Sequence, residues 1–528
     1  MKKRISKRRA QSKRQKKARK EQRKILQSRK PSRNPPLTPE QKKLKQERAK
    51  KAKALKAEKR ERKKTGKETT EANTIKKAIS SIFTPELLDG LAKSTKFIQR
   101  KGGELQAFAY MYIMSFGFFG NGKISLEGLT SLLSSSFDIE ITSQALSKRI
   151  NTKKSVDFLS RVFKKLLNIQ LITNLESNAT ARVFSNFTSV NLQDSSQISL
   201  NPLLAKDFAG CGRSGSKSAI KIDFIFDILN VAIRHVKLVK GTTSDLALAK
   251  DMVKYVKAKS LAIRDLGYFE IATLRNIQSR LGYYISRLSI GTNVYLGESD
   301  KTKLDIIQFL KNTIYAGVTS VNQIVYIGAK ERFKTLLVVE KVSENVSKQR
   351  RERYKKENGK APTEYYTEWC GYAIFITNIP NEQISPKMVI AIYKIRWQIE
   401  LIFKNLKSNL EIDYLLGTNK YRIESVVYGR LITMSTLLII QNYAGYIAEE
   451  QQEITLASQG KEVSEDKLTK WLKVNARLCV AIIKNSLLQM LVFLELEIAK
   501  VCKKRRKRQT TLEHIQEIFD EEHLKACG

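Results

Sequence analysis

Histidine and cysteine are scarce in this chain. Its 528 residues include only three histidines and five cysteines, and the cysteines are widely spaced without a Cys-x-x-Cys pair. This scarcity argues against zinc knuckles and disulfide frameworks and favours a reducing compartment. It also leaves Asp and Glu as the ligands for any bound metal ion, which favours Mg²⁺ or Mn²⁺.

The chain also lacks a long uninterrupted hydrophobic run. The most apolar stretches, 431–448 and 478–499, contain polar residues such as Gln441 and Lys484, and they are predicted to be buried helices. The basic N-terminus is not followed by an apolar segment, so no secretory signal is predicted. We therefore expect a cytoplasmic protein with no membrane partner.

Positive charge, by contrast, is in large excess. The chain has 97 Lys and Arg against 51 Asp and Glu, a formal net charge of +46, and residues 1–70 hold 31 of these cations and six of the acids. Residues 1–75 are therefore predicted to form a basic, largely disordered tail. The rest of the chain is still strongly basic, which indicates a polyanionic partner such as double-stranded DNA and a location at the nucleoid.

Residues 76–180 are predicted to form a helical DNA-binding domain. Segment 142–150 has Thr142 or Ser143 as its expected helix cap, and it carries Lys148 and Arg149, which are suited to phosphate or base contacts. We interpret the segment as part of a helix-turn-helix-like reader of DNA. A helical domain with a purely structural role is the alternative.

The period of the apolar residues changes near residue 180, and an α/β fold class is predicted from there on. Short β-branched or aromatic runs predict five strands at 183–192, 219–226, 231–239, 260–263 and 283–288, with a helix at 244–258. Further strands at 323–327, 334–340 and 371–376 and a charged loop at 347–360 belong to a separate block. The predicted organisation is thus an α/β domain at 181–290, a β-rich insertion at 291–388, the second part of the α/β domain at 389–450, and a helical C-terminal tail at 451–528.

Segment 393–407 reads as one amphipathic helix with a charged side. At about 100° per residue, four polar residues fall within roughly 60° of arc: Tyr393, Arg396, Glu400 and Lys407. A neighbouring apolar stripe would anchor the helix on a core. One carboxylate is thus held between a phenol and two cations, which suits a metal-binding acid beside phosphates. A surface helix with ordinary salt bridges is the alternative.

Two further carboxylates are predicted to lie at strand ends. Asp194 is expected to end the first strand and Asp265 the fourth. Metal-dependent phosphodiester chemistry needs carboxylates that converge from different elements, so these two acids are candidates to join Glu400. Turn formation is the alternative role for each. Other acids of this domain are interpreted as surface or pairing acids: Asp223, Asp227, Asp245 and Asp251.

Three motifs together resemble the DDE transposases of the insertion-sequence-4 family. They are Asp194 in Gln-Asp-Ser-Ser, Asp265 in Asp-Leu-Gly-Tyr-Phe, and the Tyr-x2-Arg-x3-Glu-x6-Lys spacing that begins at Tyr393. The resemblance spans residues 80–445 and does not include the basic tail. It implies a ribonuclease-H-like catalytic domain that is interrupted by the β-rich insertion.

The resemblance also implies an activity. Asp194, Asp265 and Glu400 would be the catalytic residues and would bind two Mg²⁺ or Mn²⁺ ions. The protein would bind the terminal inverted repeats of an insertion sequence, as a homodimer on DNA, and would carry out cut-and-paste transposition by DNA cleavage and strand transfer.

Further residues would contact DNA if the resemblance holds. Arg396 and Lys407 would bind phosphates near the cleaved end, and Tyr393 would hydrogen-bond a phosphate there. Trp369 and Trp397 are candidates for stacking on a flipped base, with ordinary core packing as the alternative for Trp397.

Two other functions remain compatible with the residues. One is a catalytically idle DNA-binding protein descended from a transposase, against which the intact set of acids argues. The other is a different ribonuclease-H-like nuclease, against which the spacing from Tyr393 to Lys407 argues.

Overall fold

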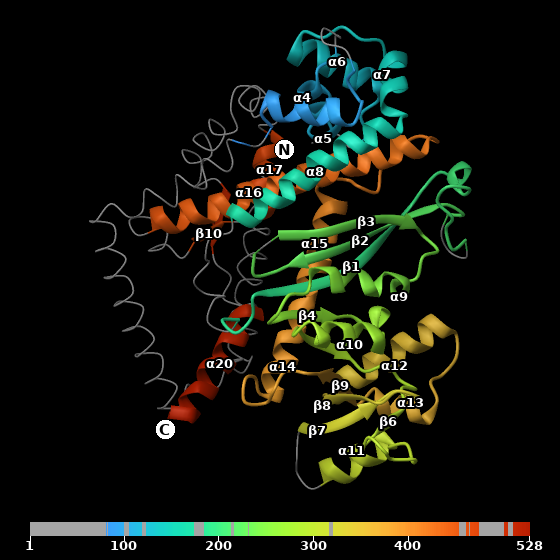
Figure 1. Ribbon diagram of the computed structural model, residues 1–528, viewed down its shortest axis with the longest axis vertical. Coiled ribbons are helices and arrows are strands. Elements are labelled where there is room, and N and C mark those ends of the chain that lie inside the picture. Colours follow the sequence, from blue (N-terminus) through green and yellow to red (C-terminus); the bar gives the residue numbers. More distant parts are fainter. Residues whose placement is uncertain are drawn as a thin grey trace, which may run out of the picture. The chain divides into compact units, whose positions relative to one another are not determined.

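A nine-stranded mixed sheet runs through the part of the chain that the computed structural model describes (Figure 1). The described residues are 81, 83–99, 105–118, 123–173, 184–212, 216–230, 232–315, 320–452, 461–463, 465–474, 501–504 and 511–527. All of them belong to one compact unit, residues 73–528. The predicted basic tail at 1–75 lies outside the described residues.

The strands of the sheet come from both the α/β domain and the insertion. They are β1 (Ser189–Ser199), β2 (Ala219–Asp227), β3 (Ala232–Lys240), β4 (Ser260–Arg264), β5 (Tyr283–Arg287), β6 (Val294–Tyr295), β7 (Ser320–Ile327), β8 (Phe333–Lys341) and β9 (Tyr372–Thr377). Their order is β3-β2-β1-β4-β5-β9-β8-β7-β6. Only the central pairs β1–β4 and β4–β5 are parallel. The insertion strands β6–β9 therefore extend the same sheet, because β9 returns to pair with β5.

Helices cover the sheet and precede it in the chain. The first group is α4 (Pro85–Ser94), α5 (Ala107–Ser115), α6 (Leu126–Phe137), α7 (Ser143–Ile150) and α8 (Lys153–Thr173). Between the strands lie α9 (Asp245–Leu248), α10 (Ile271–Ser279), α11 (Ile306–Tyr315), α12 (Glu344–Asn358) and α13 (Glu364–Trp369). The last group is α14 (Pro386–Tyr393), α15 (Trp397–Ser408), α16 (Lys420–Gln452), α17 (Glu465–Val474) and α20 (Thr511–Cys527). Four 3₁₀ segments are η1 (Pro202–Leu204), η2 (Ala249–Tyr255), η3 (Leu266–Tyr268) and η4 (Lys394–Arg396), and β10 (Lys461–Val463) pairs with β11 (Cys502–Lys504).

Most predicted strands are confirmed, but the first is misplaced. β1 begins at Ser189 and continues to Ser199, whereas the prediction ended it near residue 192. The polar segment after Leu192 stays extended because it pairs residue by residue with the apolar strand β2. Pairing with a neighbouring strand has overridden the local composition. The predicted helix at 244–258 is likewise replaced by the short α9 and the 3₁₀ segment η2.

The predicted charged loop at 347–360 is wrong, because most of this segment belongs to helix α12. Lys, Arg, Glu and Gln are good helix formers, and the helix ends at Gly359, whose φ of +68° suits glycine. Arg350 fixes the helix to the sheet by donating hydrogen bonds to the carbonyl oxygens of Cys370 and Tyr372, at 3.2 and 2.7 Å. The opposite side of α12 is exposed.

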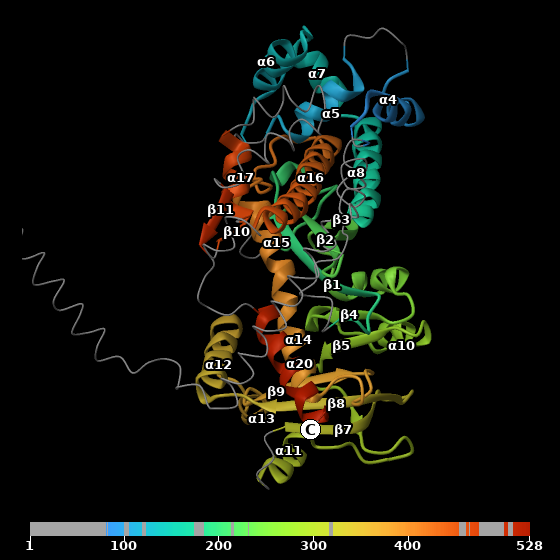
Figure 2. The ribbon, with the colours of Figure 1, turned by 90° about the vertical axis from the view of Figure 1, so that its left-hand side faces the viewer.

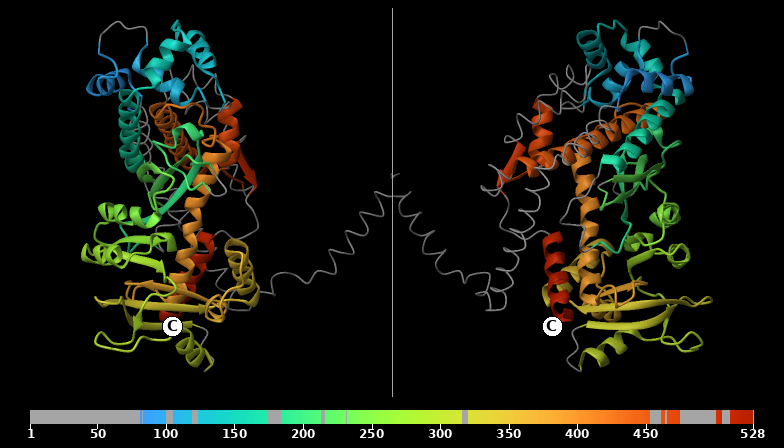
Figure 3. Two further views of the ribbon diagram at one scale, coloured as in Figure 1. Left: turned by 90° about the vertical axis from the view of Figure 1, so that its right-hand side faces the viewer. Right: turned by 60° about the vertical axis from the view of Figure 1, so that its left-hand side comes forward.

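The helical core is built around α16, which packs against α8 and α5 (Figure 2). Within the described residues, its stretch Lys420–Gln441 is the one segment long and apolar enough to cross a membrane, but 89% of its apolar window is buried inside the molecule. A buried core helix passes the same test, so this is weak evidence for a membrane span. The prediction of a buried helix over 431–448 is confirmed up to Ile440, while 478–499 lies outside the described residues. Farther along the chain, α20 packs against α14 (Figure 3).

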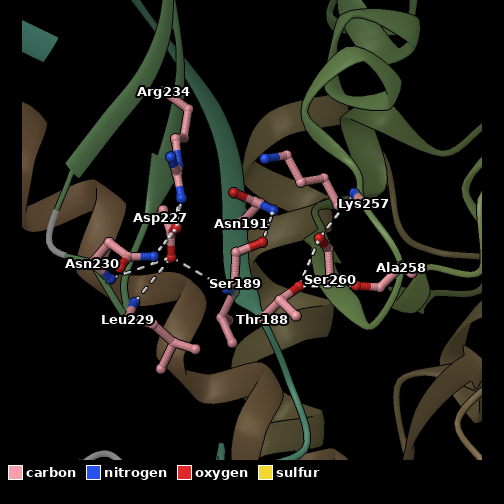
Figure 4. A network of polar contacts seen from close by, with 11 residues as sticks. Thr188, Ser189, Asn191, Asp227, Leu229, Asn230, Arg234, Lys257, Ala258 and Ser260 are labelled. Carbon is pink, nitrogen blue, oxygen red and sulfur yellow. Dashed lines mark hydrogen bonds and ion pairs between the residues drawn. The ribbon is translucent and has the colours of Figure 1, made fainter. Parts of the chain in front are cut away.

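Asp227 organises the turn between β2 and β3. Its carboxylate accepts hydrogen bonds from the backbone N–H groups of Val190, Leu229 and Asn230, at 3.1–3.4 Å, and forms an ion pair with Arg234 (Figure 4). Asp227 is completely buried. It is therefore a pairing acid, as predicted, but not a surface one, and it joins the start of β1 to the hairpin.

We expect Asp227→Ala to lower the free energy of unfolding by about 3 kcal/mol, because the substitution leaves a cation and several buried N–H groups without their acceptor. Urea denaturation measures the change. Asp157→Ala is the control, since Asp157 forms an exposed ion pair with Lys153 and its loss should leave the midpoint nearly unchanged. Equal effects of the two substitutions would contradict this account of Asp227.

Candidate active site

Asp194 and Asp265 come from the two parallel strands at the centre of the sheet. β1 pairs with β4 from Ser189 to Leu192, so the residues that follow lie at the same edge. Asp265 directly follows β4 and precedes η3, as predicted. Asp194, however, does not end its strand: it lies inside β1 and pairs with Phe224 of β2. The Asp194 carboxylate lies on the part of β1 that extends beyond β4 and pairs only with the antiparallel strand β2.

The helix predicted over 393–407 is present, but a 3₁₀ turn interrupts its α-helical geometry. Tyr393 is the last residue of α14, the 3₁₀ segment η4 ends at Arg396, and Glu400 lies in the first turn of α15. A 3₁₀ turn has about 3.0 residues per turn, which changes the angle between the side chains on either side of it. The prediction of a continuous helix was wrong because no proline or glycine marks the break in the sequence.

Arg396 lies among the three predicted carboxylates. Its Nη1 is 3.8 Å from Oδ2 of Asp194, and its Nε is 3.5 Å from Oδ1 of Asp265. Its Nη2 donates a short hydrogen bond to Oε1 of Glu400, four residues farther along the chain. The three acids therefore share one guanidinium, although their sequence positions span more than two hundred residues.

The site is half-buried, and this changes its titration. Burial raises the pKa of Asp194 to about 6, with a further contribution from the nearby charges of Asp265 and Glu400, while the Ser195 N–H and Arg396 act in the opposite direction. Burial works against the charge of Arg396, but the surrounding acids outweigh it and raise the pKa of that guanidinium. A substantial fraction of Asp194 is therefore protonated near pH 6.

Tyr393 completes the site from the side of α14. Its hydroxyl lies 3.4 Å from Oδ1 of Asp265, to which it donates a hydrogen bond, and its ring contacts Phe375 of β9. Burial, followed by the negative charge of Asp265, raises the pKa of the Tyr393 phenol. The phenol therefore stays a hydrogen-bond donor at neutral pH.

The donor set has the chemistry of a site for a hard divalent cation. Carboxylate oxygens are the preferred ligands of Mg²⁺, and all three acids reach the same guanidinium. Among the described residues, no three His, Cys, Asp or Glu side chains are grouped closely enough to hold one ion together. The acids instead surround Arg396, which supplies the compensating charge.

The other predicted site residues are placed less centrally. Lys407 is half-buried in the last turn of α15. Trp397 begins α15 and is 56% exposed, so core packing of Trp397 is excluded. Trp369 ends α13 and packs partly buried against an apolar cluster to which both the α/β domain and the insertion contribute. Lys148 and Arg149 lie on α7, which packs against α6 and α16, and of the two expected caps, Thr142 and Ser143, it is Thr142 that caps this helix.

Arg287 is a residue of this site that the sequence reasoning missed. It ends β5, directly after Ser286, which pairs with Arg264 of β4. Its guanidinium carbon lies 5.9 Å from the centre of the Tyr393 ring. Its position in the sequence could have indicated it, because Arg287 is a cation at the end of β5. That strand follows Asp265 in the chain and pairs with β4 in the parallel direction.

Comparison with known proteins agrees with this geometry. The family model described as "Transposase DDE domain" matches residues 185–435. The chain is 30% identical over 404 residues to the transposase for insertion sequence element IS1151 of Clostridium perfringens, which covers 72% of this chain and 84% of the relative. The chain belongs to the DDE transposases. This transposase is also 27% identical over 424 residues to that of element IS231F of Bacillus thuringiensis subsp. israelensis, covering 75% and 84% of the two chains.

We expect Trp397→Ala to change the stability of this transposase very little, because more than half of the side chain is already in water. Ile399→Ala, two residues away and fully buried, should lower the free energy of unfolding by about 3 kcal/mol. Urea denaturation of both variants measures the difference. A loss of stability in Trp397→Ala as large as that in Ile399→Ala would show that the indole serves the core.

Proposed function

We propose that this DNA transposase cuts DNA at the ends of its insertion sequence and joins the freed end to a target, with Asp194, Asp265 and Glu400 as its catalytic acids. The observation that carries the proposal is the convergence of these three acids, from β1, β4 and α15, on one guanidinium. An enzyme that cleaves DNA and transfers strands is what membership of the family implies.

The family is generally dependent on divalent metal ions, and we propose Mg²⁺ or Mn²⁺, bound as two ions by the three acids. Such ions would activate the attacking oxygen and offset the charge on the leaving oxygen. Asp194 must be deprotonated to act as a ligand, so its raised pKa means that a metal ion competes with a proton for this carboxylate at mildly acidic pH.

The cations and the phenol beside the acids would hold the phosphates of the DNA end. Arg396 can bind a phosphate with two parallel hydrogen bonds, which a lysine cannot reproduce. Lys407 would add a second positive charge, and the Tyr393 hydroxyl is a donor next to Asp265. Arg396 would exchange its carboxylate partners for phosphate when DNA binds. The residue spacing from Tyr393 to Lys407 supports membership of the insertion-sequence-4 group.

Several further assignments belong to this proposal. The exposed indole of Trp397 supports stacking on a flipped base, and Trp369, which is partly buried, is the second candidate. The mixed sheet is compatible with a ribonuclease-H-like catalytic domain, and residues 76–180 would read the DNA with Lys148 and Arg149. We also propose a homodimer on paired ends, located at the nucleoid in the cytoplasm. The full set of acids disfavours an idle descendant.

Replacement of the acids by their amides should separate binding from cleavage. We expect Glu400→Gln and Asp265→Asn to reduce cleavage of a labelled duplex that carries the element's inverted repeat at least a thousandfold, on the order expected for poor metal ligands such as amides. Affinity for the duplex should stay within a few-fold. Glu331→Gln is the control, since Glu331 is exposed and pairs with Arg275. Normal cleavage by either site variant would refute the assignment of that acid.

The exposed side of α12 is a second surface on which DNA binding can be tested. Within the described part of the chain, four exposed cations of this helix form no ion pair: Lys348, Arg353, Lys355 and Lys356. Their joint replacement by Gln should flatten the dependence of log Kobs on log salt by about 0.9 for each phosphate that the helix no longer neutralises.

Filter binding between about 50 and 200 mM salt measures that slope. The control replaces the same number of exposed lysines elsewhere in the insertion by Gln: Lys301, Lys303, Lys330 and Lys334. If both quadruple variants keep the slope of the wild type, α12 makes no phosphate contacts.

A further inference from the structure

Adjacent side chains of β1 lie on opposite faces of the sheet and have different partners. Asp194 faces α15 and Arg396, while the neighbouring Ser195 points to the other face of the sheet, as alternate residues of a strand do. There the Ser195 hydroxyl donates a 2.7 Å hydrogen bond to Oδ1 of Asp245. The same oxygen accepts a hydrogen bond from the Lys221 ammonium at 3.0 Å. Asp245 is thus attached to the residue next to a proposed catalytic acid.

Asp245 also touches the turn that carries Asp265. Gly267 lies in η3, two residues after Asp265, and a Cβ atom at this position would be only 3.1 Å from Oδ2 of Asp245. The absence of a side chain at Gly267 therefore lets the turn approach the carboxylate closely. One carboxylate, at the start of α9, is hydrogen-bonded to the segment that presents Asp194 and lies close to the turn that follows Asp265.

A buried network extends this arrangement to the other residues that flank the acids. Asp223 of β2, which is fully buried, accepts hydrogen bonds from the Tyr268 hydroxyl at 2.7 Å and from the Gln193 amide at 3.1 Å. Arg264 donates to the Tyr268 carbonyl at 2.8 Å. Gln193 and Ser195 flank Asp194, and Arg264 and Tyr268 lie on either side of Asp265, so the network holds both neighbourhoods. The interpretation of Asp223 as a surface or pairing acid is corrected by this buried position.

We infer that Asp245 is a positioning residue that sets the separation of Asp194 and Asp265 by holding Ser195 and the Gly267 turn from behind the sheet. The inference rests on the proposed metal-binding role of the two acids. A carboxylate pair that binds metal depends on its spacing, and partners that orient metal ligands commonly contribute about ten- to a hundredfold in affinity or rate. Asp245 acts through Ser195 and the turn, and it lies on the face of the sheet opposite to Arg396.

Asp245→Ala is a feasible test because its side chain is 33% exposed, so the variant should fold. We expect the variant to bind the inverted-repeat duplex normally but to need about tenfold more Mn²⁺ for half-maximal cleavage. Mn²⁺ bound to the protein–duplex complex, measured by electron paramagnetic resonance, should fall by a similar factor. Asp245→Asn, which keeps an acceptor for Ser195, should recover part of the loss.

Asp251→Ala is the matched control. Asp251 follows in η2 and is more buried than Asp245, and its partners Lys237 and Lys254 belong to β3 and η2, not to β1 or to the turn after β4. If loss of stability alone caused the weaker Mn²⁺ binding of Asp245→Ala, Asp251→Ala would impair Mn²⁺ binding at least as much. That result would overturn the inference.

A second pair of variants tests the contact with the turn. Gly267→Ala should weaken Mn²⁺ binding in the wild type, because its methyl group presses on the Asp245 carboxylate. In the Asp245→Ala background the same change should have little further effect, since the partner is absent.

The possible outcomes separate the two proposals. A wild-type complex that binds no Mn²⁺ contradicts the metal-dependent function and, with it, the role of Asp245. A wild type that binds Mn²⁺ and an Asp245→Ala variant that binds it equally well contradict the positioning role alone.

Discussion

The attraction between Arg396 and three carboxylates is the interaction on which the site depends. Half-buried acids so close together repel one another unless a cation lies among them. The guanidinium offsets part of this repulsion, and the surrounding acids raise its pKa above its ordinary value. One cation is set against three acids, so the site keeps an excess of acidic groups.

The sheet supplies the geometry that this charge balance requires. Parallel pairing of β1 with β4 brings Asp194 and Asp265 to one edge, and the opposite face of the same strands is held by buried hydrogen bonds. A polar network in this position is more costly than an apolar core unless its members are satisfied. Its placement behind the acids links the packing of the domain to the spacing of the functional groups.

The insertion also supports the site. Its last strand, β9, pairs with β5 and packs Phe375 against the ring of Tyr393. α14 then leads through η4 into α15, so the chain that leaves the sheet after β5 returns to place Arg396 and Glu400 opposite β1. Removing the insertion would therefore take away a support of Tyr393 as well as the exposed cations of α12.

The sequence by itself determined the candidate carboxylates, the spacing of the cations around Glu400 and most strands, because these follow from local composition and motif. It did not determine the 3₁₀ turn at η4 or the extension of β1 through Asp194, because these depend on pairing and packing with distant segments. Helix α12, by contrast, follows from local helix formers and the glycine at its end, and the prediction of a loop there overlooked them. The contact of Asp245 with Ser195 and Gly267 joins residues 50 and 22 positions apart. Only the tertiary structure decides such contacts, since spacing along a chain does not specify which strands become neighbours.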